Sequence, residues 1–521
     1  MKDADGVEGF VDPPLRAVRA QMEMAETMGF MGVAGLDAAA ARSHPAGLTL
    51  DSRLSHSMRT RSPARPPTCS LAYPLTRSLH FLVAGGSLFF MCARAYSSDQ
   101  IYQVGVAKVD ITPDYPVRLN GYAARKSECQ GVAQRVWASA LAIGSEKEKP
   151  AVLITVDNCE VPVNVRNAVL GRLGRQVAPE RLAICSTHTH SAPWLEGSVP
   201  NIFTGPIPAG EQAHVSAYTQ QTIEALVDVA LRALGDRRPA RLSRGKGEAG
   251  FAMNRRTKGG PVDHDLPALF VTGLDGTVRA VFTSYACHCT TLGGDFNQVC
   301  GDWAGYAEEY LEQAHPGAVA LVALGCAGDA NPEPRGSLEL TKLHGRELAE
   351  AVERVRTNEL SPVVGKLTCR IRNFTLPLDT LPTRAEWEAQ ARLTNYLGRF
   401  ARANLARLDQ GQPLLTKVPY VVQTWSFGDN LTMVFLAGEV VVDYSLRLKR
   451  EFDASRLWIN AYANDVPCYI PSERVLKEGG YEGGAAMVYY DKPTRFAPGV
   501  ENLIVDVVHE LVPRGYCAAK P

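Results

Sequence analysis

The amino-acid sequence predicts an α/β fold in which one or more mixed sheets are covered by helices. Two observations predict it: short apolar segments alternate with helical patterns from about residue 101, and the balance shifts toward strands after Lys366. Neither an internal repeat nor a low-complexity linker interrupts this stretch. We therefore expect residues 100–521 to form a single domain.

The predicted strands are short segments, β-branched or apolar, that end in small or polar residues. In chain order they are PAVLITVDN (150–158), RLAICST (181–187), TVRAVFTSYACH (277–288) and AVALVALGC (318–326). Two further strands, YVVQTWSF (420–427) and LTMVFLAGEVVVDY (431–444), follow Lys366. Gly428, Asp429 and Asn430 between these two predict a hairpin turn.

The clearest predicted helix spans roughly Ser216 to Leu234 and stops at Gly235. Helical spacing is kept by its apolar residues Ile223, Leu226, Val227, Ala230, Leu231 and Leu234. Similar patterns predict helices near residues 304–314, 337–356 and 384–408.

The first hundred residues are rich in Arg, Ala, Met and Pro and show no sustained periodicity. We interpret residues 1–75 as a non-native or disordered leader, in which 1–57 come from an over-extended reading frame and Met58 is one candidate start. Residues 76–95 have the pattern of a signal peptide, with an apolar stretch from Phe81 to Met91 and an A-x-A site ending at Ala95. The apolar stretch is too short for an ordinary membrane span. We therefore expect an exported protein, periplasmic or extracellular, with a buried core helix or a signal anchor as the alternative.

Charge and cysteine content narrow the class of partner. Lys plus Arg equals Asp plus Glu at 55 each, without a long single-sign run, so a small or neutral partner is favoured over nucleic acid or an anionic membrane. Export would place the cysteines after Ala95 in an oxidising compartment, with a pairing that spacing does not determine. Cys287, Cys289 and Cys300 lie near His288 but lack the C-x-x-C spacing of a structural zinc site.

Histidines and one acid occupy the ends of the predicted strands. His188 and His190 follow the strand LAICS, and their imidazoles share one face if the extended conformation persists. His288 closes a second strand in the same way. Glu439 is a carboxylate in an apolar run, a costly placement unless it is paired, protonated or metal-bound. An H-x-H pair alone is a weak signal, and a salt-bridge or helix-cap role for Glu439 stays open.

An ordered series of motifs runs through the predicted mature chain: VGVAKVDITP, LNGYA, THTHSAP, MNRR, GDWAGYAEEYLE, GCAGDANP, LAGE and CYIPSERVLKEGGYEGG. This series resembles the neutral (nonlysosomal) ceramidase family of secreted zinc amidases. The resemblance implies a ceramidase-like catalytic domain with a zinc ion held by His188, His288, Glu439 and Tyr469. It also implies that His190 is the second, non-ligand histidine of the site and that Arg255 is the arginine of the family's N-R-S element.

The implied residue set is chemically coherent. Two imidazoles and a carboxylate are a common catalytic zinc shell, and zinc lowers the pKa of bound water toward roughly 7 while it polarises a carbonyl. His190 would move a proton to the leaving group, and Arg255 would stabilise the developing oxyanion. Asp157 is a candidate for orienting a histidine, and Asp302 for a structural or similar supporting role.

Two features depart from the family's pattern. GDANP stands where ceramidases carry the serine proposed to act in catalysis, so the aligned residue is Asn331 and a covalent serine mechanism there is excluded. Asn331 can still hydrogen-bond the substrate or the oxyanion. In addition, the sequence ends near the close of the catalytic region, so we expect no C-terminal immunoglobulin-like domain.

We therefore expect an exported zinc-dependent hydrolase of amide (or ester) bonds that acts on a small-molecule or lipid amide, with ceramide as one candidate. Two alternatives stay open. One is a catalytically inactive secreted binding protein on the same scaffold, which Asn331 permits. The other is a two-metal phosphate- or sulfate-ester hydrolase, in which Asp157, Asp295 and Asp302 supply extra carboxylates.

Overall fold

A nine-stranded mixed sheet carries the first half of the domain in the computed structural model, which describes residues 100–517 except 204 and 359. Its order is β4-β3-β2-β1-β5-β7-β8-β9, and β11 pairs with β5. Only β3–β4 and β8–β9 are parallel. The strands are β1 (Ile101–Asp110), β2 (Trp137–Ile143), β3 (Ala151–Val156), β4 (Leu182–Ser186), β5 (Arg238–Glu248), β7 (Asp265–Gly273), β8 (Val278–Tyr285), β9 (Val319–Leu324) and β11 (Ser361–Pro362). The four strands predicted for this part of the chain are confirmed.

The two ends of this sheet are tied together by a segment from elsewhere in the chain, Ala461–Asn464, which we call the bridging segment. Ala461 N donates to Leu324 O at the end of β9 (2.9 Å), and Asn464 N donates to Ile184 O in β4 (2.7 Å). An odd number of antiparallel pairings separates β4 from β8, so in a flat sheet their carboxyl ends would point in opposite directions. Strand twist of roughly 20–25° per step accumulates along the order and brings both carboxyl ends to the same side.

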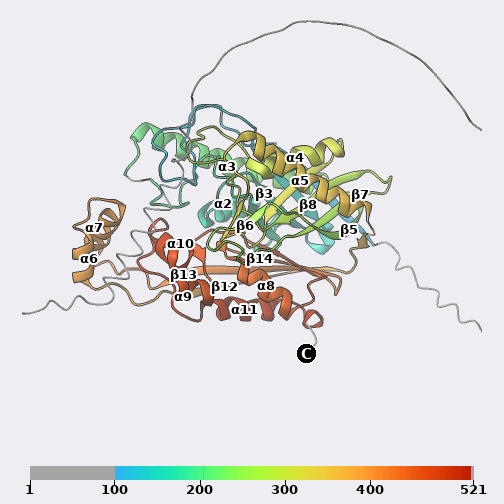
Figure 1. Ribbon diagram of the computed structural model, residues 1–521. Helices are drawn as coiled ribbons and strands as arrows, with labels where there is room; N and C mark the ends of the chain where they lie inside the picture. Colours follow the sequence, from blue (N-terminus) through green and yellow to red (C-terminus); the bar gives the residue numbers. More distant parts are fainter. Residues whose placement is uncertain (1–99, 204, 359, 518–521) are drawn as a thin grey trace, which may run out of the picture. The chain divides into compact units, whose positions relative to one another are not determined.

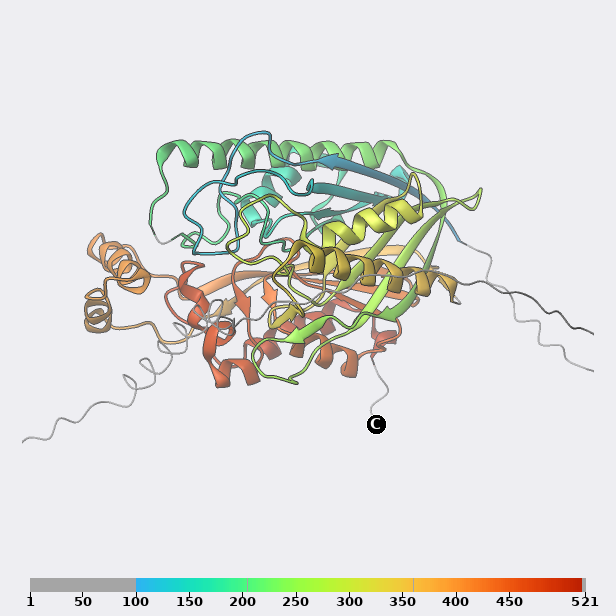
Figure 2. The ribbon, with the colours of Figure 1, turned by 45° about the horizontal axis from the view of Figure 1, so that its top comes forward.

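Four helices cover the outer face of the first sheet (Figure 1). They are α2 (Val163–Leu173), α3 (Ala209–Gly235), α4 (Asp302–Ala314) and α5 (Leu338–Thr357). Figure 2 shows α3 lying along β1 and β2, where Leu226, Val229 and Ala230 are buried. The helices predicted near 216–234, 304–314 and 337–356 are confirmed, although α3 begins earlier, at Ala209.

A second sheet packs against the inner face of the first. Its order is β12 (Leu367–Pro377), β13 (Lys417–Phe427), β14 (Leu431–Leu436) and β16 (Leu457–Asn460). Trp425, Phe435 and Trp458 of this sheet share a core with Leu242 and Phe282 of the first. The helices α8 (Val442–Glu451) and α11 (Val500–Leu511) lie on its outer side (Figure 1). The result is four layers, helices–sheet–sheet–helices.

The predicted hairpin at 428–430 joins β13 to β14, and Asn430 N closes the turn on Phe427 O (2.9 Å). The run after it, 431–444, is not one strand as predicted. Gly438 has a φ of 83° and ends the extended path, so Glu439–Val440 form a separate strand, β15, and α8 starts at Val442. The turn removes Glu439 from the second sheet.

Two small sheets carry residues of the predicted site. β6 (Ala252–Asn254) pairs with β10 (Ala330–Pro332), which sets Asn331 opposite Met253, two residues before Arg255. β15 (Glu439–Val440) pairs in parallel with β17 (Tyr469–Ile470), which sets Glu439 directly opposite Tyr469. Strand pairing therefore fixes the distance of Asn331 from the segment that carries Arg255, and of Glu439 from Tyr469.

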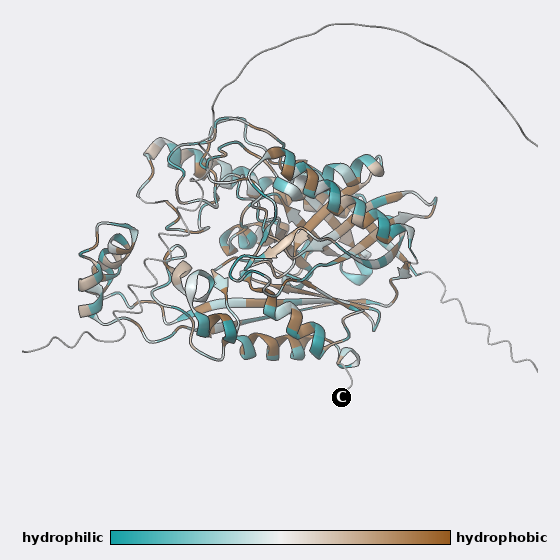
Figure 3. Cartoon of the chain, in the orientation of Figure 1, coloured by the Kyte–Doolittle hydropathy of each residue, from teal (hydrophilic) through white to brown (hydrophobic). Residues whose placement is uncertain are grey.

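The helix predicted over 384–408 is two helices, α6 (Arg384–Gln390) and α7 (Tyr396–Asp409). Asn395 interrupts the pattern because its side chain accepts from the amides of Leu397 and Gly398 and so starts a new helix. The remaining helices are α9 (Glu473–Glu478) and α10 (Gly480–Gly483), and single 3₁₀ turns are η1 (Glu146–Glu148), η2 (Gly174–Gln176), η3 (Pro179–Arg181), η4 (Ala485–Val488) and η5 (Arg514–Tyr516). Figure 3 shows the strands of the first sheet mostly hydrophobic and the helices two-sided, as the layered packing requires.

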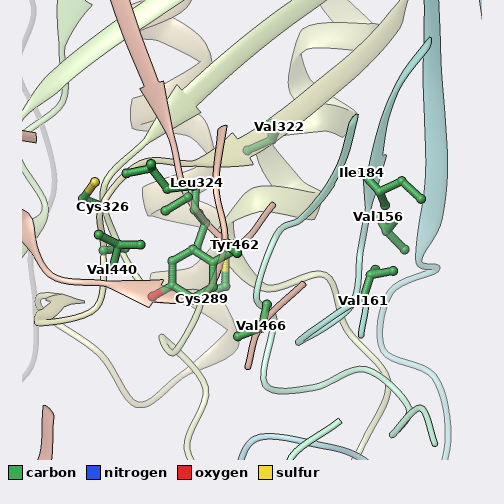
Figure 4. Packing of buried hydrophobic residues seen from close by; sticks show 14 of the residues in the cluster. Val156, Val161, Ile184, Cys289, Val322, Leu324, Cys326, Val440, Tyr462 and Val466 are labelled. Atoms are coloured by element: carbon green, nitrogen blue, oxygen red, sulfur yellow. The ribbon is translucent and has the colours of Figure 1, made fainter. Parts of the chain in front are cut away.

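Buried side chains fill the space where the bridging segment meets the sheet ends. Figure 4 shows Tyr462 of this segment packed among Val440, Cys289 and Val466, beside Leu324 of β9. Tyr462 is 1% exposed. This core supports the loops that leave β4 and β8.

The cysteines after Ala95 are all free thiols, and most are buried. No helix in the described part of the chain is long and apolar enough to span a membrane. The predicted leader (1–75) and signal peptide (76–95) lie outside the described residues, whereas the predicted domain of 100–521 falls within one compact unit, Ser98–Pro521.

Candidate metal centre

Three predicted ligands meet at one point. His188 follows β4, His288 follows β8, and Glu439 opens β15. Oε2 of Glu439 lies 3.1 Å from Nε2 of His188 and 3.1 Å from Nε2 of His288. The three residues are at most 2% exposed. Segments some 250 residues apart in sequence thus converge on a buried set of two nitrogens and one oxygen.

The outer nitrogens of both rings are fixed by main-chain carbonyls. Nδ1 of His188 lies 2.7 Å from Cys159 O, and Nδ1 of His288 lies 2.7 Å from Ala327 O. A carbonyl oxygen only accepts, so each Nδ1 carries the hydrogen and each Nε2 presents a lone pair to the centre.

The centre is therefore built only from electron-pair donors. Oε2 of Glu439 is buried and has no hydrogen-bond donor among the described residues. Lone pairs of two imidazoles and a carboxylate, each held from behind, are the donor set that a divalent metal such as zinc prefers. The residues present fit such an ion.

Two pKa shifts describe the charges at the centre. Burial, followed by the nearby charge of Arg255, lowers the pKa of His288 to about 4. Burial opposes ionisation of Glu439, but contact with His188 and His288 outweighs it and holds the pKa of that carboxyl well below its usual range.

Tyr469 is the fourth predicted ligand. Its hydroxyl lies 3.4 Å from Nε2 of His288 and accepts from Nη2 of Arg255 (2.9 Å). Burial raises the pKa of this phenol well above its usual value. Tyr469 is thus a neutral oxygen donor at the edge of the centre.

His190 reaches the centre by a different path from the one predicted. The strand ends at Ser186 and His188 has a φ of 56°, so the chain turns between the two histidines instead of staying extended. The Nε2 atoms of His188 and His190 are nevertheless 3.0 Å apart. Burial, then the neighbouring His188 and His288, lower the pKa of His190 well below its usual value, so the ring is neutral at pH 7.

A glycine makes room for His190. Gly121 has a φ of 91°, and a Cβ at this position would lie 2.4 Å from Cγ of His190. On another side the ring of Tyr122 contacts His190, with centroids 5.0 Å apart. Residues Gly121 and Tyr122 of the LNGYA motif thus pack against the His190 imidazole.

Arg255 and Asn331 lie on the more open side of the centre. Nη1 of Arg255 is 3.2 Å from Nε2 of His288 and 3.4 Å from Oδ1 of Asn331. The Arg255 side chain is 20% exposed, and Glu482 holds its Nε at 2.8 Å. Glu482 also binds Nη1 of Arg256 (2.6 Å). All seven predicted site residues therefore come together.

Sequence reasoning missed the residues behind the centre. Glu482 lies inside the YEGG segment of the series, but nothing in that pattern marked it as the partner of Arg255. The hydroxyl of Tyr490 contacts Oε1 of Glu439 and lies 3.1 Å from Oε1 of Glu160. Glu160 follows a strand, β3, as the histidines follow β4 and β8, and this position could have indicated a site residue. No sequence pattern indicated Tyr490.

Asp157 does not orient a histidine, because carbonyl oxygens fill that role. It belongs to a second group of buried acids, where its Oδ2 accepts from Trp137 N (2.9 Å) and it lies near Lys108 and Glu308. Burial raises the pKa of Asp157 to about 7. Lys108 in turn binds Glu312 (2.8 Å).

Asp302 has a structural role. Its carboxylate accepts from Leu292 N (3.0 Å) and Trp303 N (2.6 Å), which fixes the loop between His288 and α4. In the described part of the chain, the groups able to hold a metal contain only Glu439 with His188 and His288, or Cys159 with His188 and His190. Neither the extra aspartates nor Cys287, Cys289 and Cys300 join them.

Comparison with known proteins gives one family. The model of "Neutral/alkaline non-lysosomal ceramidase, N-terminal" matches residues 102–342, which include His188, His190, Arg255, His288 and Asn331 but not Glu439 or Tyr469. The neutral ceramidase of Drosophila melanogaster is 26% identical over 275 residues, which are 47% of this chain and 38% of that protein. For the neutral ceramidase of Drosophila pseudoobscura pseudoobscura the values are 24% over 263 residues, 45% and 36%. The match thus spans well under half of these relatives.

The fold has a counterpart of known structure. The crystal structure of neutral ceramidase from Pseudomonas aeruginosa superposes with a TM-score of 0.62 at 19% identity, covering 81% of this chain and 76% of that one. A ceramidase described as complexed with C2 gives a TM-score of 0.61 over 81% and 77%. At this identity the likeness concerns the fold, and it agrees with the α/β class predicted from the sequence.

Proposed function

Because the chain belongs to the neutral/alkaline non-lysosomal ceramidase family, we propose that it is a zinc-dependent hydrolase that cleaves an amide (or ester) bond. The observation that carries the proposal is the meeting of His188, His288 and Glu439 with three electron-pair donors directed at one point. The substrate is a small-molecule or lipid amide. Ceramide is one candidate, since the similar proteins are named for it.

His188, His288 and Glu439 would hold the metal, with Tyr469 as a further oxygen donor. When bound, zinc acts as a Lewis acid on a carbonyl group and makes water a competent nucleophile near neutral pH. The second group of buried acids lies apart from these residues, which gives no support to a two-metal phosphate- or sulfate-ester hydrolase.

His190 is the proton carrier in this proposal. Its ring is neutral at pH 7, and its Nε2 lies 3.0 Å from Nε2 of His188, so with the His188 lone pair committed to a metal this nitrogen would be free to accept a proton from the attacking water. The same nitrogen can then give that proton to the departing nitrogen or oxygen. His190 is also less buried than the ligands, as a group that meets the substrate must be.

Arg255 supplies the positive charge for the oxyanion that forms on the attacked carbonyl. Glu482 binds Nε on one side, so the two terminal nitrogens are directed at Tyr469, His288 and Asn331. Asn331 has no nucleophilic group. It therefore positions Arg255 or the substrate, and attack by water needs no covalent intermediate.

We also propose that the protein is exported. The support is the signal-peptide pattern of residues 76–95, which ends in an A-x-A site at Ala95. Amino-terminal sequencing of protein recovered from an exporting host tests this, and a mature chain that starts near Tyr96 is expected. Retention of residues 76–95 on the recovered protein would refute it.

Metal content and turnover test the enzyme proposal together. We expect the purified protein to contain about one zinc per chain and to hydrolyse members of an acyl-amide and ester panel that includes ceramides, with loss of activity in a chelator and recovery with zinc. His188→Ala should lose both properties. His214→Ala is the matched control, because His214 lies on α3 and pairs with Glu128 (2.7 Å) away from the centre.

Other outcomes point elsewhere. Zinc binding without turnover across the whole panel would support the inactive binding protein. Two metal ions per chain with phosphate-ester turnover would support the two-metal alternative. Full activity in His188→Ala, or in the chelator, would contradict the proposed site.

A further inference from the structure

The hydroxyl of Tyr490 lies between two carboxyl groups. It contacts Oε1 of Glu439, and it lies 3.1 Å from Oε1 of Glu160. Tyr490 comes just after η4, Glu160 after β3, and Glu439 in β15. None of the three residues is more than 4% exposed. Three distant segments therefore build one buried hydrogen-bonded row that ends at the metal centre.

Counting hydrogens shows that one of the two carboxyls must be neutral. A phenol has a single hydrogen, and an ionised carboxylate only accepts. Tyr490 can therefore donate to one carboxyl only, and its oxygen must accept a hydrogen from the other. Two ionised carboxylates on one phenol would leave a buried repulsive contact without a hydrogen.

Glu160 is the carboxyl that carries the hydrogen. Oε2 of Glu439 lies between the two imidazole nitrogens of the proposed metal site, and a divalent cation held there favours the ionised form of this acid. Glu160 has no cationic partner within salt-bridge distance in the described part of the chain, since Lys492 donates to the Tyr490 carbonyl instead (2.8 Å). In agreement, burial and then the charge of Glu439 raise the pKa of Glu160 well above its usual value.

We propose that Glu160 is a positioning residue for the metal ligand Glu439. As a neutral acid it donates to the oxygen of Tyr490, so the Tyr490 hydrogen is directed at Oε1 of Glu439. Oε1 is thereby occupied, and Oε2 is left to bind the metal between His188 and His288. This inference rests on the metal site proposed above and adds two residues that the sequence did not indicate.

Such a row orients the ligand before the metal arrives. Hydrogen-bonded partners behind a metal ligand typically change metal affinity or activity by about 10–100-fold when removed. Successive hydrogen bonds also strengthen each other in a buried environment. A row that served packing alone would change stability and leave metal affinity untouched, so affinity is the decisive measurement.

The test measures zinc affinity of the full chain by competition with a chromophoric chelator, starting from metal-free protein. We expect Tyr490→Phe to bind zinc about 10–100-fold more weakly. Glu160→Gln should stay within about 3-fold of wild type, because the amide still donates a hydrogen to Tyr490. Glu160→Ala should be weakened by about 10-fold.

Controls separate the possible causes. Tyr489→Phe is the matched control, because Tyr489 is the neighbouring tyrosine and its ring stacks on Tyr396 (5.4 Å) instead of joining the row. Thermal unfolding of each metal-free variant checks that the fold is kept, and the isosteric Glu160→Gln keeps the test valid if Glu160→Ala unfolds. Wild-type affinity in Tyr490→Phe would overturn the inference, as would equal losses in Glu160→Gln and Tyr490→Phe. Failure of the proposed metal site itself would look different, because wild type would then bind no zinc.

Discussion

Glu439 and Asp157 are equally buried, with 2% and 1% of their surfaces exposed, yet their surroundings differ. Glu439 meets lone pairs of two imidazoles, whereas Asp157 meets a main-chain N–H and lies near the ammonium group of Lys108. An acid that faces other acceptors calls for a cation. Asp157 has a main-chain donor on Oδ2 and a lysine nearby, so it does not call for a metal ion even though its Oδ1 has no hydrogen-bond partner among the described residues. The contrast teaches that burial of an acid alone does not identify a metal site. Whether its neighbours are hydrogen-bond donors or acceptors does.

The largest expected effect comes from removing the charge of Glu439. Glu439→Gln should weaken zinc binding by more than about 100-fold, beyond the loss expected for a residue behind the ligands, and abolish hydrolysis. Metal-free stability should not fall, because the new amide can donate to an imidazole lone pair. Zinc titration and urea unfolding of the same sample check both halves. Unchanged zinc affinity in Glu439→Gln would contradict the assignment of Glu439 as a metal ligand, and with it the contrast to Asp157.

Asp157 should control stability and its pH dependence. Its pKa is about 7 in the folded protein against an ordinary value of 3.8, so the folded protein holds the proton more tightly. The free energy of unfolding should therefore fall as pH rises from about 4 to about 7, by at most about 4 kcal/mol. Asp157→Asn should remove that decline and be more stable than wild type at pH 8.

Urea unfolding at pH 4.5 and pH 8 measures this effect, with zinc affinity as the internal control. Lys108, Glu308 and Glu312 face Asp157 and titrate in both proteins, so the difference between variant and wild type isolates Asp157. Parallel pH profiles of the two proteins would contradict the assignment. A change in zinc affinity would show that the two groups of acids are coupled.

Gly121→Ala tests the support of His190 without touching a ligand. The added Cβ would lie 2.4 Å from the ring carbon, so the imidazole must move. We expect kcat to fall by about 100-fold with zinc affinity kept, because misplacement of about 1 Å at a reacting group costs that much. Steady-state kinetics with zinc titration distinguish this outcome from ligand loss. Wild-type kcat would show that His190 does not carry the proton.

The smallest effect is expected at Glu482. Glu482→Gln keeps the shape of the side chain but weakens its hold on Arg255, so kcat/KM should fall by about 10-fold with zinc content unchanged. Arg256, which shares Glu482, supplies the control: Arg256→Lys should change kcat/KM less than Glu482→Gln does. A larger loss in Arg256→Lys would assign the effect to local packing.

The sequence predicted the scaffold where local pattern and packing agree. The strands before His188 and His288 are apolar runs that end in polar residues, and α3, α4 and α5 follow helical spacing. Prediction failed where one residue overrides a pattern. Gly438 ends a strand inside an apolar run, and Asn395 starts a new helix within a continuous helical pattern.

The seven site residues were reached through the resemblance, and the structure brings them together from distant segments. Composition and spacing alone indicated only the histidines and Glu439. Glu160, Tyr490 and Glu482 could not be found this way, because their roles depend on contacts between segments hundreds of residues apart. The turn at His188 was also hidden, since a positive φ at a histidine has no sequence signal.

The position of the bridging segment late in the sequence has a consequence for folding during synthesis. Synthesis releases His188 and His288 from the ribosome long before Ala461–Asn464, which closes the space between β9 and β4. Until the C-terminal part of the chain docks, the two imidazoles lack Glu439, Tyr469 and the packing of the bridging segment. A nascent chain therefore cannot complete the proposed metal centre until its final third has been synthesised and folded.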